Sequence, residues 1–273
     1  MIAPPAFRRP AVEGRISIAP DLTLHYLDWP GEGVPVLFLH GSKSNARAWD
    51  FVVDASALGD RRFIAPDQRG HGLSEAPTTG YQIENLASDM WAFLDALSIE
   101  RAVVVGTATG GYMALTMASS RPERVAGIAV VDAGIWINPN LNFAPRKRVY
   151  DSMTAGRAAL DRSDLWDEAA KDHYALHSFR DLGDGRVEYR HFEQPETAES
   201  RAAFDVEALK IGCPTLLVRG EHSDITEPDT HARLAGFIPQ AEIATVAGSG
   251  HHVSLDKPAG LAAILDRFIA GLD

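Results

Sequence analysis

The sequence predicts an α/β protein with a mostly parallel central sheet and helices on both faces. Short β-branched apolar runs alternate with longer helical stretches, as in strands joined by crossover helices. Most of these runs are continuously apolar, which is typical of strands covered on both faces. The chain has 273 residues, of which 45% are hydrophobic. It is therefore long enough to bury one sizeable core.

The order of apolar and amphipathic segments places the individual elements. Near the N-terminus, Ile16–Ile18 and Leu22–Tyr26 predict an antiparallel hairpin. The predicted strands are Val34–Leu39, Arg62–Ala65, Ala102–Val105, Ile128–Val131, Thr215–Val218 and Glu242–Val246. The predicted helices are Asn85–Leu97, Gly111–Ser120, Asp229–Gly236 and Pro258–Ala270.

One long segment interrupts this alternation. Arg146–Leu160 and Ser163–Ser178 have the pattern of amphipathic helices, and Asp181–Phe192 contains Gly183-Asp184-Gly185, a hairpin signal. A helical insertion between two strands of a sheet is most simply a cap that holds substrate and excludes water. We therefore expect residues 1–133 and 209–273 to form the core and residues 134–208 to form a helical cap.

Composition narrows the classes of function. A formal net charge of −11 argues against nucleic acid and anionic membranes as partners, and leaves a small-molecule substrate. The single cysteine, Cys213, excludes an internal disulfide and stands before an apolar run, as a small core residue would. We expect no signal peptide, and no apolar run approaches the ~20 residues of a membrane span. We expect a soluble cytoplasmic protein, and the sequence does not indicate its oligomeric state.

The strongest motif is Gly-Thr-Ala-Thr-Gly at Gly106–Gly110, between an apolar run and a predicted helix. It has the frame of the nucleophile elbow G-x-S-x-G, with Ala108 at the position of the serine. The nucleophile of such an elbow sits on a sharp turn, so the residues two places away on either side must be small. Gly106 and Gly110 meet that requirement. A phosphate loop would need Gly-Lys-Ser/Thr at a different spacing.

Three further segments occur in an order that supports the elbow. They are Phe38–Ser42 (Phe-Leu-His-Gly-Ser), Pro66–Ser74 (Pro-Asp-Gln-Arg-Gly-His-Gly-Leu-Ser) and Ala247–His252 (Ala-Gly-Ser-Gly-His-His). With the elbow, they resemble the α/β-hydrolase superfamily over essentially the whole chain. The resemblance is specific for the α/β-hydrolase fold and much less so for substrate, because this fold hosts many chemistries.

The resemblance implies roles for several residues. The catalytic histidine follows a glycine late in the chain, which favours His251, with the adjacent His252 as the other possibility. The backbone N–H groups of Ser42 and Thr109 are the expected oxyanion donors. The segment Asp67–Ser74 is expected to be structural, with His71 as a scaffold residue.

Two aspartates are candidates for the acid that orients His251. Asp224 follows the strand Thr215–Val218 in what looks like the usual acid loop, and it is our first choice. Asp132 ends the preceding strand, at a place where some family members carry the acid instead. Either carboxylate would orient the imidazole and stabilise its charged form.

The residues that would bind the substrate are less clearly marked in the sequence than the catalytic ones. Trp49 follows the oxyanion turn and Tyr112 follows the elbow, so each is a candidate for lining the pocket and equally for packing. Trp136, Arg180 and Arg190 are candidate pocket residues in the cap. These types suit an apolar or aromatic substrate with a carboxylate or carbonyl. No histidines or carboxylates fall at metal-ligand spacing, and we expect neither metal nor cofactor.

Alanine at the nucleophile position decides which chemistry remains. A methyl group has no proton to lose and cannot form an acyl-enzyme. Because the rest of the hydrolase pattern is present, we favour a hydrolase of a small ester, lactone, amide or β-ketone (C–C) bond, such as an apolar or aromatic degradation intermediate, inactivated by Ser-to-Ala substitution. The alternatives are a serine-free His/Asp enzyme, such as a cofactor-independent oxygenase or lyase, and a ligand-binding protein.

Overall fold

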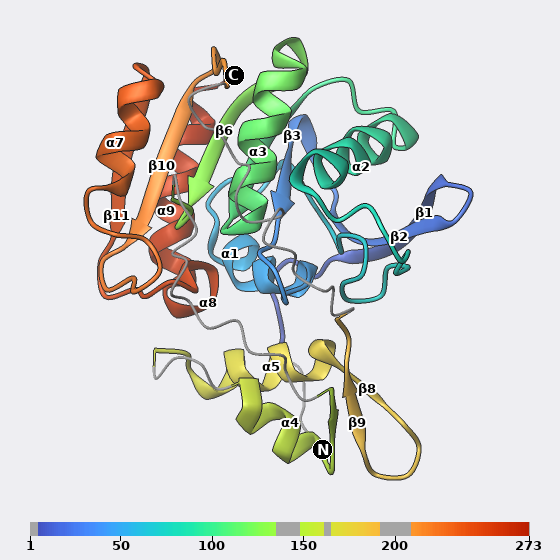
Figure 1. Ribbon diagram of the computed structural model, residues 1–273. Coiled ribbons are helices and arrows are strands. Elements are labelled where there is room, and N and C mark those ends of the chain that lie inside the picture. Colours follow the sequence, from blue (N-terminus) through green and yellow to red (C-terminus); the bar gives the residue numbers. More distant parts are fainter. Residues whose placement is uncertain (1–4, 135–147, 161–164, 192–208, 273) are drawn as a thin grey trace.

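An eight-stranded sheet forms the centre of the protein (Figure 1). The computed structural model describes residues 5–134, 148–160, 165–191 and 209–272. The strands lie in the order β1-β2-β4-β3-β5-β6-β10-β11; β1 and β2 form an antiparallel hairpin, β2 pairs antiparallel with β4, and the other pairs are parallel. Their bounds are Val12–Ala19 (β1), Leu22–Trp29 (β2), Glu32–Leu39 (β3), Arg61–Pro66 (β4), Ala102–Thr107 (β5), Val125–Val131 (β6), Thr215–Gly220 (β10) and Ala241–Val246 (β11).

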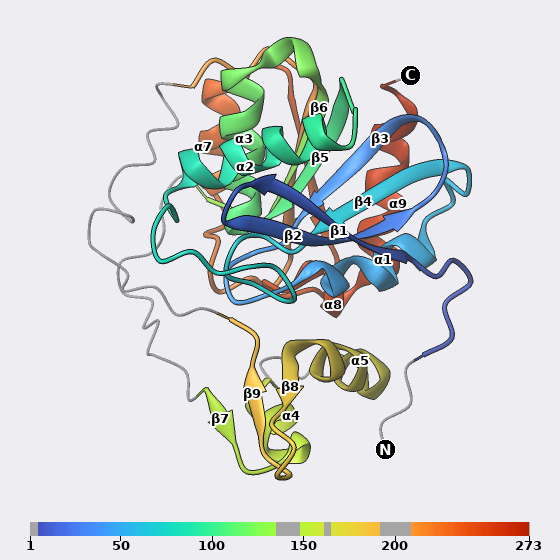
Figure 2. The same ribbon diagram turned by 90° about the vertical axis from the view of Figure 1, so that its right-hand side faces the viewer.

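Helices cover both faces of this sheet, as the sequence predicts (Figure 2). Successive strand residues point to opposite faces, so Leu37 packs in one core cluster and Phe38 in the other. The first face is covered by α2 (Ile83–Ala96), α3 (Thr109–Ser120) and α7 (Thr230–Phe237). The second is covered by α1 (Asp50–Ala55), α8 (Val253–Asp256), α9 (Pro258–Ala270) and the 3₁₀-helix η1 (Ala46–Trp49). Another 3₁₀-helix, η2 (Pro122–Arg124), directly precedes β6.

The central strands are apolar because neither face meets water. All seven residues of β6 are buried, as are the first five of β5. This double coverage explains why the sequence shows continuous apolar runs in these strands. Because β3, β4, β5, β6, β10 and β11 are parallel, their carboxyl ends lie at one edge of the sheet, where the loops that follow them meet.

Between β6 and β10 the chain forms an insertion, which in the described residues comprises 148–160 and 165–191. The sequence predicts a helical cap with one hairpin. The described part of the insertion has two helices and a separate antiparallel sheet in the order β7-β9-β8. The bounds are Val149–Tyr150 (β7), Met153–Leu160 (α4), Glu168–Ser178 (α5), Phe179–Asp181 (β8) and Val187–Tyr189 (β9).

The sequence predicts a helix over Arg146–Leu160, and this prediction is wrong at its N-terminal part, where the chain forms the strand β7. Val149 and Tyr150 pair with β9, in keeping with the strand preference of β-branched and aromatic residues. The β8–β9 hairpin occurs where Gly183-Asp184-Gly185 predicts a turn, and both glycines have positive φ, 82° and 89°.

The insertion packs onto the core near the carboxyl ends of the parallel strands (Figures 1 and 2). Its aromatic residues Trp166 and Tyr174 share one buried cluster with Ala48 and Leu255 of the core. Their burial ties the insertion to the loop after β3 and to α8. None of the helices among the described residues is long and apolar enough to cross a membrane.

Candidate active site

The turn between β5 and α3 has the geometry of a nucleophile elbow. Strand β5 ends at Thr107, α3 begins at Thr109, and Ala108 lies between them with φ 49° and ψ −116°. A non-glycine residue at positive φ is strained, and such strain persists only where the surrounding structure holds it. Here the Ala108 N–H donates to Val131 O of β6 at 3.0 Å, and Ala108 O accepts from Gly111 N at 2.9 Å. These bonds fix the turn independently of the side chain at position 108.

The two glycines of the elbow are required by contact distances. A Cβ on Gly106 would lie 2.0 Å from the carbonyl oxygen of Gly110. A Cβ on Gly110 would lie 2.2 Å from the carbonyl oxygen of Leu39, at the end of β3. Both obstacles are backbone atoms, so no side-chain movement could make room. The sequence rule that these positions be small therefore follows from the close approach of β5, α3 and β3.

The turn after β3 meets the tip of the elbow. A Cβ on Gly41 would lie 3.1 Å from the Ala108 Cβ, so this glycine runs directly beside Ala108. The side chains of the next residues join the two segments, with Ser42 Oγ 2.8 Å from Thr109 Oγ1. Thr109 begins α3, so its N–H has no acceptor within the helix. The structure thus brings together the two residues that the sequence predicts as oxyanion donors.

A buried carboxylate holds the predicted histidine. His251 Nδ1 lies 2.6 Å from Asp132 Oδ2, and Asp132 is fully buried at the end of β6, with φ 48°. The same carboxylate accepts hydrogen bonds from Gly220 N at 3.0 Å, Ser223 Oγ at 2.6 Å and Thr226 Oγ1 at 3.2 Å. An Asp132 carboxylate that accepts from Nδ1–H selects the tautomer in which Nε2 carries a lone pair. His251 is therefore oriented as a base.

The structure places the alternative acid, and not the first choice, beside His251. Asp224 is exposed. Its neighbours Ser223 and Thr226 turn inward as hydrogen-bond donors to Asp132. The loop after β10 thus supports the acid that ends β6. The sequence analysis does not single out Ser223 and Thr226. Their three-residue spacing could have indicated them, because it is typical of a turn in which a serine hydroxyl accepts from a backbone N–H. Here Ser223 Oγ accepts from Thr226 N at 3.1 Å.

The candidate residues follow three strands whose carboxyl ends lie at the same end of the sheet. Ala108 follows β5, Asp132 follows β6, and His251 follows β11 after a short turn. The backbone connects the strands there, since Asp132 N donates to Val218 O of β10 at 2.7 Å. His252, the other possible histidine, packs its ring against Trp166 of the insertion at a centroid distance of 5.5 Å. It is His251 that contacts the carboxylate.

His71 has a structural environment. It is buried, and burial, with the neighbouring His40, lowers its pKa to about 3. Its Nδ1 lies 2.8 Å from Arg69 O and must carry the proton, so Nε2 accepts a hydrogen bond from Lys43 N at 3.3 Å. A neutral His71 therefore anchors the loop that carries Ser42, as expected of a scaffold residue.

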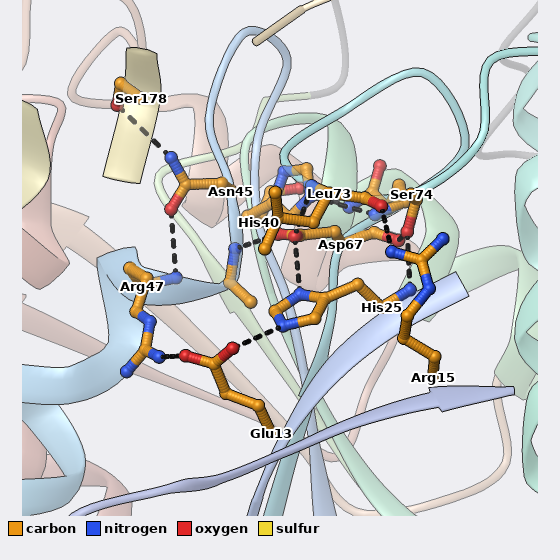
Figure 3. Close-up of polar contacts among 12 residues, drawn as sticks. Glu13, Arg15, His25, His40, Asn45, Arg47, Asp67, Leu73, Ser74 and Ser178 are labelled. Carbon is orange, nitrogen blue, oxygen red and sulfur yellow. Dashed lines mark hydrogen bonds and ion pairs between the residues drawn. The ribbon is translucent and has the colours of Figure 1, made fainter. Parts of the chain in front are cut away.

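Asp67 is the centre of a polar network under the same loop (Figure 3). Its carboxylate accepts from Ala46 N at 2.7 Å and Leu73 N at 2.9 Å, and contacts His25 Nδ1 at 2.8 Å. Burial alone would raise the pKa of Asp67, but the hydrogen bond and charge of His25 outweigh it and hold the pKa below its ordinary value. The segment that begins at Asp67 thus ties loops together, as the resemblance implies.

The five predicted substrate-binding residues are placed differently from one another. Trp49 is fully buried and stacks on Phe38 in the core, so it packs beneath the site. Tyr112 is buried at the start of α3, and burial raises its pKa to about 12. Arg180 is exposed and pairs with Glu188 on the β8–β9 hairpin, and Arg190 Nε donates to Phe179 O at 3.0 Å. Trp136 lies outside the described residues. Both arginines thus contact residues of the insertion itself.

Comparisons with known proteins agree with this geometry. A family model described as the alpha/beta hydrolase fold matches residues 34–151. The "Putative carbamate hydrolase RutD" of Variovorax paradoxus is 30% identical over 91% of this chain and 97% of its own. The chain belongs to the α/β-hydrolase family.

Further relatives of this α/β-hydrolase have various names. The 2-hydroxymuconate semialdehyde hydrolase of a Pseudomonas species is 28% identical over 95% of each chain. The crystal structure of E-2-(acetamidomethylene)succinate hydrolase matches with a TM-score of 0.81 at 25% identity, over 95% of this chain and 99% of the other. The homologues are hydrolases that act on small substrates. Within the described residues, no group of three or more His, Cys, Asp or Glu side chains is arranged to hold a metal.

The elbow contacts predict a large stability difference between two glycine substitutions. Gly106→Ala should lower the free energy of unfolding by about 3 kcal/mol or more, because its Cβ would meet a backbone oxygen at 2.0 Å. Gly59→Ala is the matched control; nothing lies within 4 Å of its Cβ, and we expect a change within about 0.5 kcal/mol. Chemical denaturation measures both, and equal effects would contradict the proposed contact.

The state of His71 predicts a pH dependence of stability. Above its ordinary pKa of 6.5, His71 is neutral in the folded and unfolded chains alike. Below that pH the unfolded chain binds a proton that the folded chain does not bind until about pH 3, so stability falls as pH falls. His71→Gln keeps an acceptor for Lys43 N–H. It should reduce the slope of unfolding free energy between pH 6 and 4.5 by about 1.4 kcal/mol per pH unit. Parallel slopes in the two proteins would exclude a neutral, buried His71.

Proposed function

We propose that this chain carries the site of a hydrolase for small ester, lactone, amide or β-ketone (C–C) substrates, in which alanine replaces the serine of a Ser-His-Asp triad. The observation that carries the proposal is the 2.6 Å contact between His251 Nδ1 and the buried Asp132 carboxylate. It lies at the sheet edge where the elbow meets the oxyanion turn. A serine-hydrolase site needs, besides the serine, an oriented base, an elbow and two oxyanion donors. We assign these roles to His251, to the turn at Ala108 and to the backbone N–H groups of Thr109 and Ser42.

With a serine at position 108, the geometry supports acyl transfer in two steps. The serine Oγ attacks the substrate carbonyl while His251 Nε2 takes its proton, and Asp132 stabilises the resulting imidazolium. The N–H groups of Ser42 and Thr109 stabilise the oxyanion. His251 then returns the proton to the leaving group, and a water activated by the same nitrogen cleaves the acyl-enzyme.

With Ala108 in place, the first covalent step has no nucleophile. The methyl group cannot donate a proton or form an ester, so this chain would bind its substrate without acylation. The turn itself does not need the hydroxyl, because backbone bonds and the two glycines hold its shape. The substitution thus removes chemistry while leaving the fold and the other site residues unchanged.

In this proposal the insertion is the cap of the site, which would extend over residues 134–208. Four of its aromatic residues, Trp166, Tyr174, Phe179 and Tyr189, are buried in the cluster that joins the insertion to the core, and we expect other residues to select the substrate. Two relatives, named as a 2-hydroxymuconate semialdehyde hydrolase and a 2-(acetamidomethylene)succinate hydrolase, support a small-molecule substrate.

One observation also supports a second function. The His251–Asp132 pair is complete in the chain as it stands, without any nucleophile. A histidine so oriented could abstract a proton from a bound substrate, as in a cofactor-independent oxygenase or a lyase. The two functions differ in whether Ala108 abolishes or permits turnover.

Restoring the serine tests the proposal. Ala108→Ser should raise kcat/KM for short p-nitrophenyl esters and a panel of aryl esters and lactones by on the order of 10⁴-fold or more, with a burst on the activated esters, because it supplies the missing nucleophile. His251→Ala in the same background should remove the gain. Turnover of a substrate by the Ala108 chain that depends on His251 would instead establish the serine-free enzyme. A folded Ala108→Ser protein without activity on any of these substrates would contradict the hydrolase proposal.

The acid is tested in the active background. Asp132→Asn in the Ala108→Ser protein should lower kcat by on the order of 10⁴-fold, because an amide no longer selects the required tautomer of His251. Asp224→Asn, the matched change on the exposed loop, should leave kcat within about twofold. The reverse ranking of the two variants would make Asp224 the acid.

A further inference from the structure

The loop that carries Ser42 is held by the insertion. We call residues Ser42–Asn45 the oxyanion loop. The hydroxyl of Tyr189, at the end of β9, donates to the carbonyl oxygen of Lys43. The hydroxyl of Tyr174, on α5, lies 3.5 Å from the same oxygen and 3.0 Å from Ser44 Oγ. Two phenol groups from different elements of the insertion therefore converge on the residue that follows Ser42.

The core holds Lys43 from the other side. Its N–H donates to Nε2 of His71 at 3.3 Å. Lys43 has φ 58°, a left-handed conformation that side chains other than glycine adopt only at a cost in free energy. Its backbone N–H and C=O are thus both engaged, one by the core and one by the insertion. Such double anchoring explains how a lysine keeps this conformation.

Asn45, two residues after Lys43, is anchored to the same insertion (Figure 3). Asn45 Nδ2 donates at 3.2 Å to Oγ of Ser178, which is the last residue of α5. Asn45 Oδ1 accepts from Arg47 N at 3.0 Å. Asn45 and Ser178 are both buried. Three consecutive loop residues, 43–45, thus make side-chain or backbone contacts with the insertion, directly after the residue whose N–H is the expected oxyanion donor.

We propose that the insertion positions the oxyanion hole as well as covering the substrate. In this view Tyr189, assisted by Tyr174, is a positioning residue: its hydroxyl fixes the Lys43 carbonyl, and through it the direction of the Ser42 N–H. Oxyanion stabilisation depends on donors that are aimed before the reaction begins. Movement of the insertion away from the core would therefore disorder the donor at the moment when the site opens.

The structural step is tested in the chain with Ala108, by amide hydrogen exchange. Tyr189→Phe should accelerate exchange of the Lys43 N–H at least about threefold, because the loop loses its bond to the insertion while the phenyl ring keeps its packing. Tyr150→Phe is the matched control. It removes a phenol hydroxyl from the adjacent strand β7, and Lys43 exchange should stay within the error of the parent protein. Unchanged exchange in Tyr189→Phe would overturn the proposal.

The chemical consequence rests on the proposed function and is tested in the Ala108→Ser protein. Tyr189→Phe should lower kcat about tenfold and leave KM within about twofold. The reason is that the Ser42 N–H would no longer be held toward the oxyanion of the transition state, while substrate binding is retained. A raised KM with unchanged kcat would show that Tyr189 shapes only the substrate pocket and would overturn the positioning role. If Ala108→Ser is inactive while Tyr189→Phe still accelerates exchange, the hydrolase proposal fails and the structural coupling stands.

Discussion

The buried carboxylate of Asp132 is the point on which the site depends. It ends β6 in a left-handed conformation and accepts hydrogen bonds from a backbone N–H, two hydroxyls and an imidazole. A charge without solvent contact needs such partners. They come from the last residue of β10, from the loop that follows β10 and from the turn that follows β11. The same contacts that compensate this charge therefore also gather the loops of the site and orient His251.

The hydroxyl that the proposed function requires at position 108 is independent of this arrangement. The elbow is shaped by close backbone approaches at Gly106 and Gly110, and Ala108 is held by its backbone. A serine and an alanine are consequently interchangeable for folding and opposite for chemistry. This separation explains how a chain can keep an oriented histidine, two converging donors and an insertion over the strand ends while lacking a nucleophile.

The sequence predicts the sheet, the elbow and the oxyanion turn because each depends on local pattern: continuous apolar runs, glycines at fixed spacing, and a turn after a strand. It does not decide between Asp132 and Asp224. Both follow adjacent parallel strands and reach the same edge, and only the inward turn of Ser223 and Thr226 separates them. Likewise, the position of Trp49 after the oxyanion turn does not reveal that its side chain faces the core, because packing against Phe38 sets the direction of that side chain.

In the proposed function, this site is a serine-hydrolase triad complete except for one hydroxyl. Intact-protein mass spectrometry after exposure to a fluorophosphonate measures this most directly, because such a reagent labels a serine only where a neighbouring base activates it. The account predicts one adduct at position 108 of the Ala108→Ser protein, and none on the Ala108 chain or on Ala108→Ser with His251→Ala. Labelling that is absent from the folded Ala108→Ser protein, or that persists without His251, would contradict it.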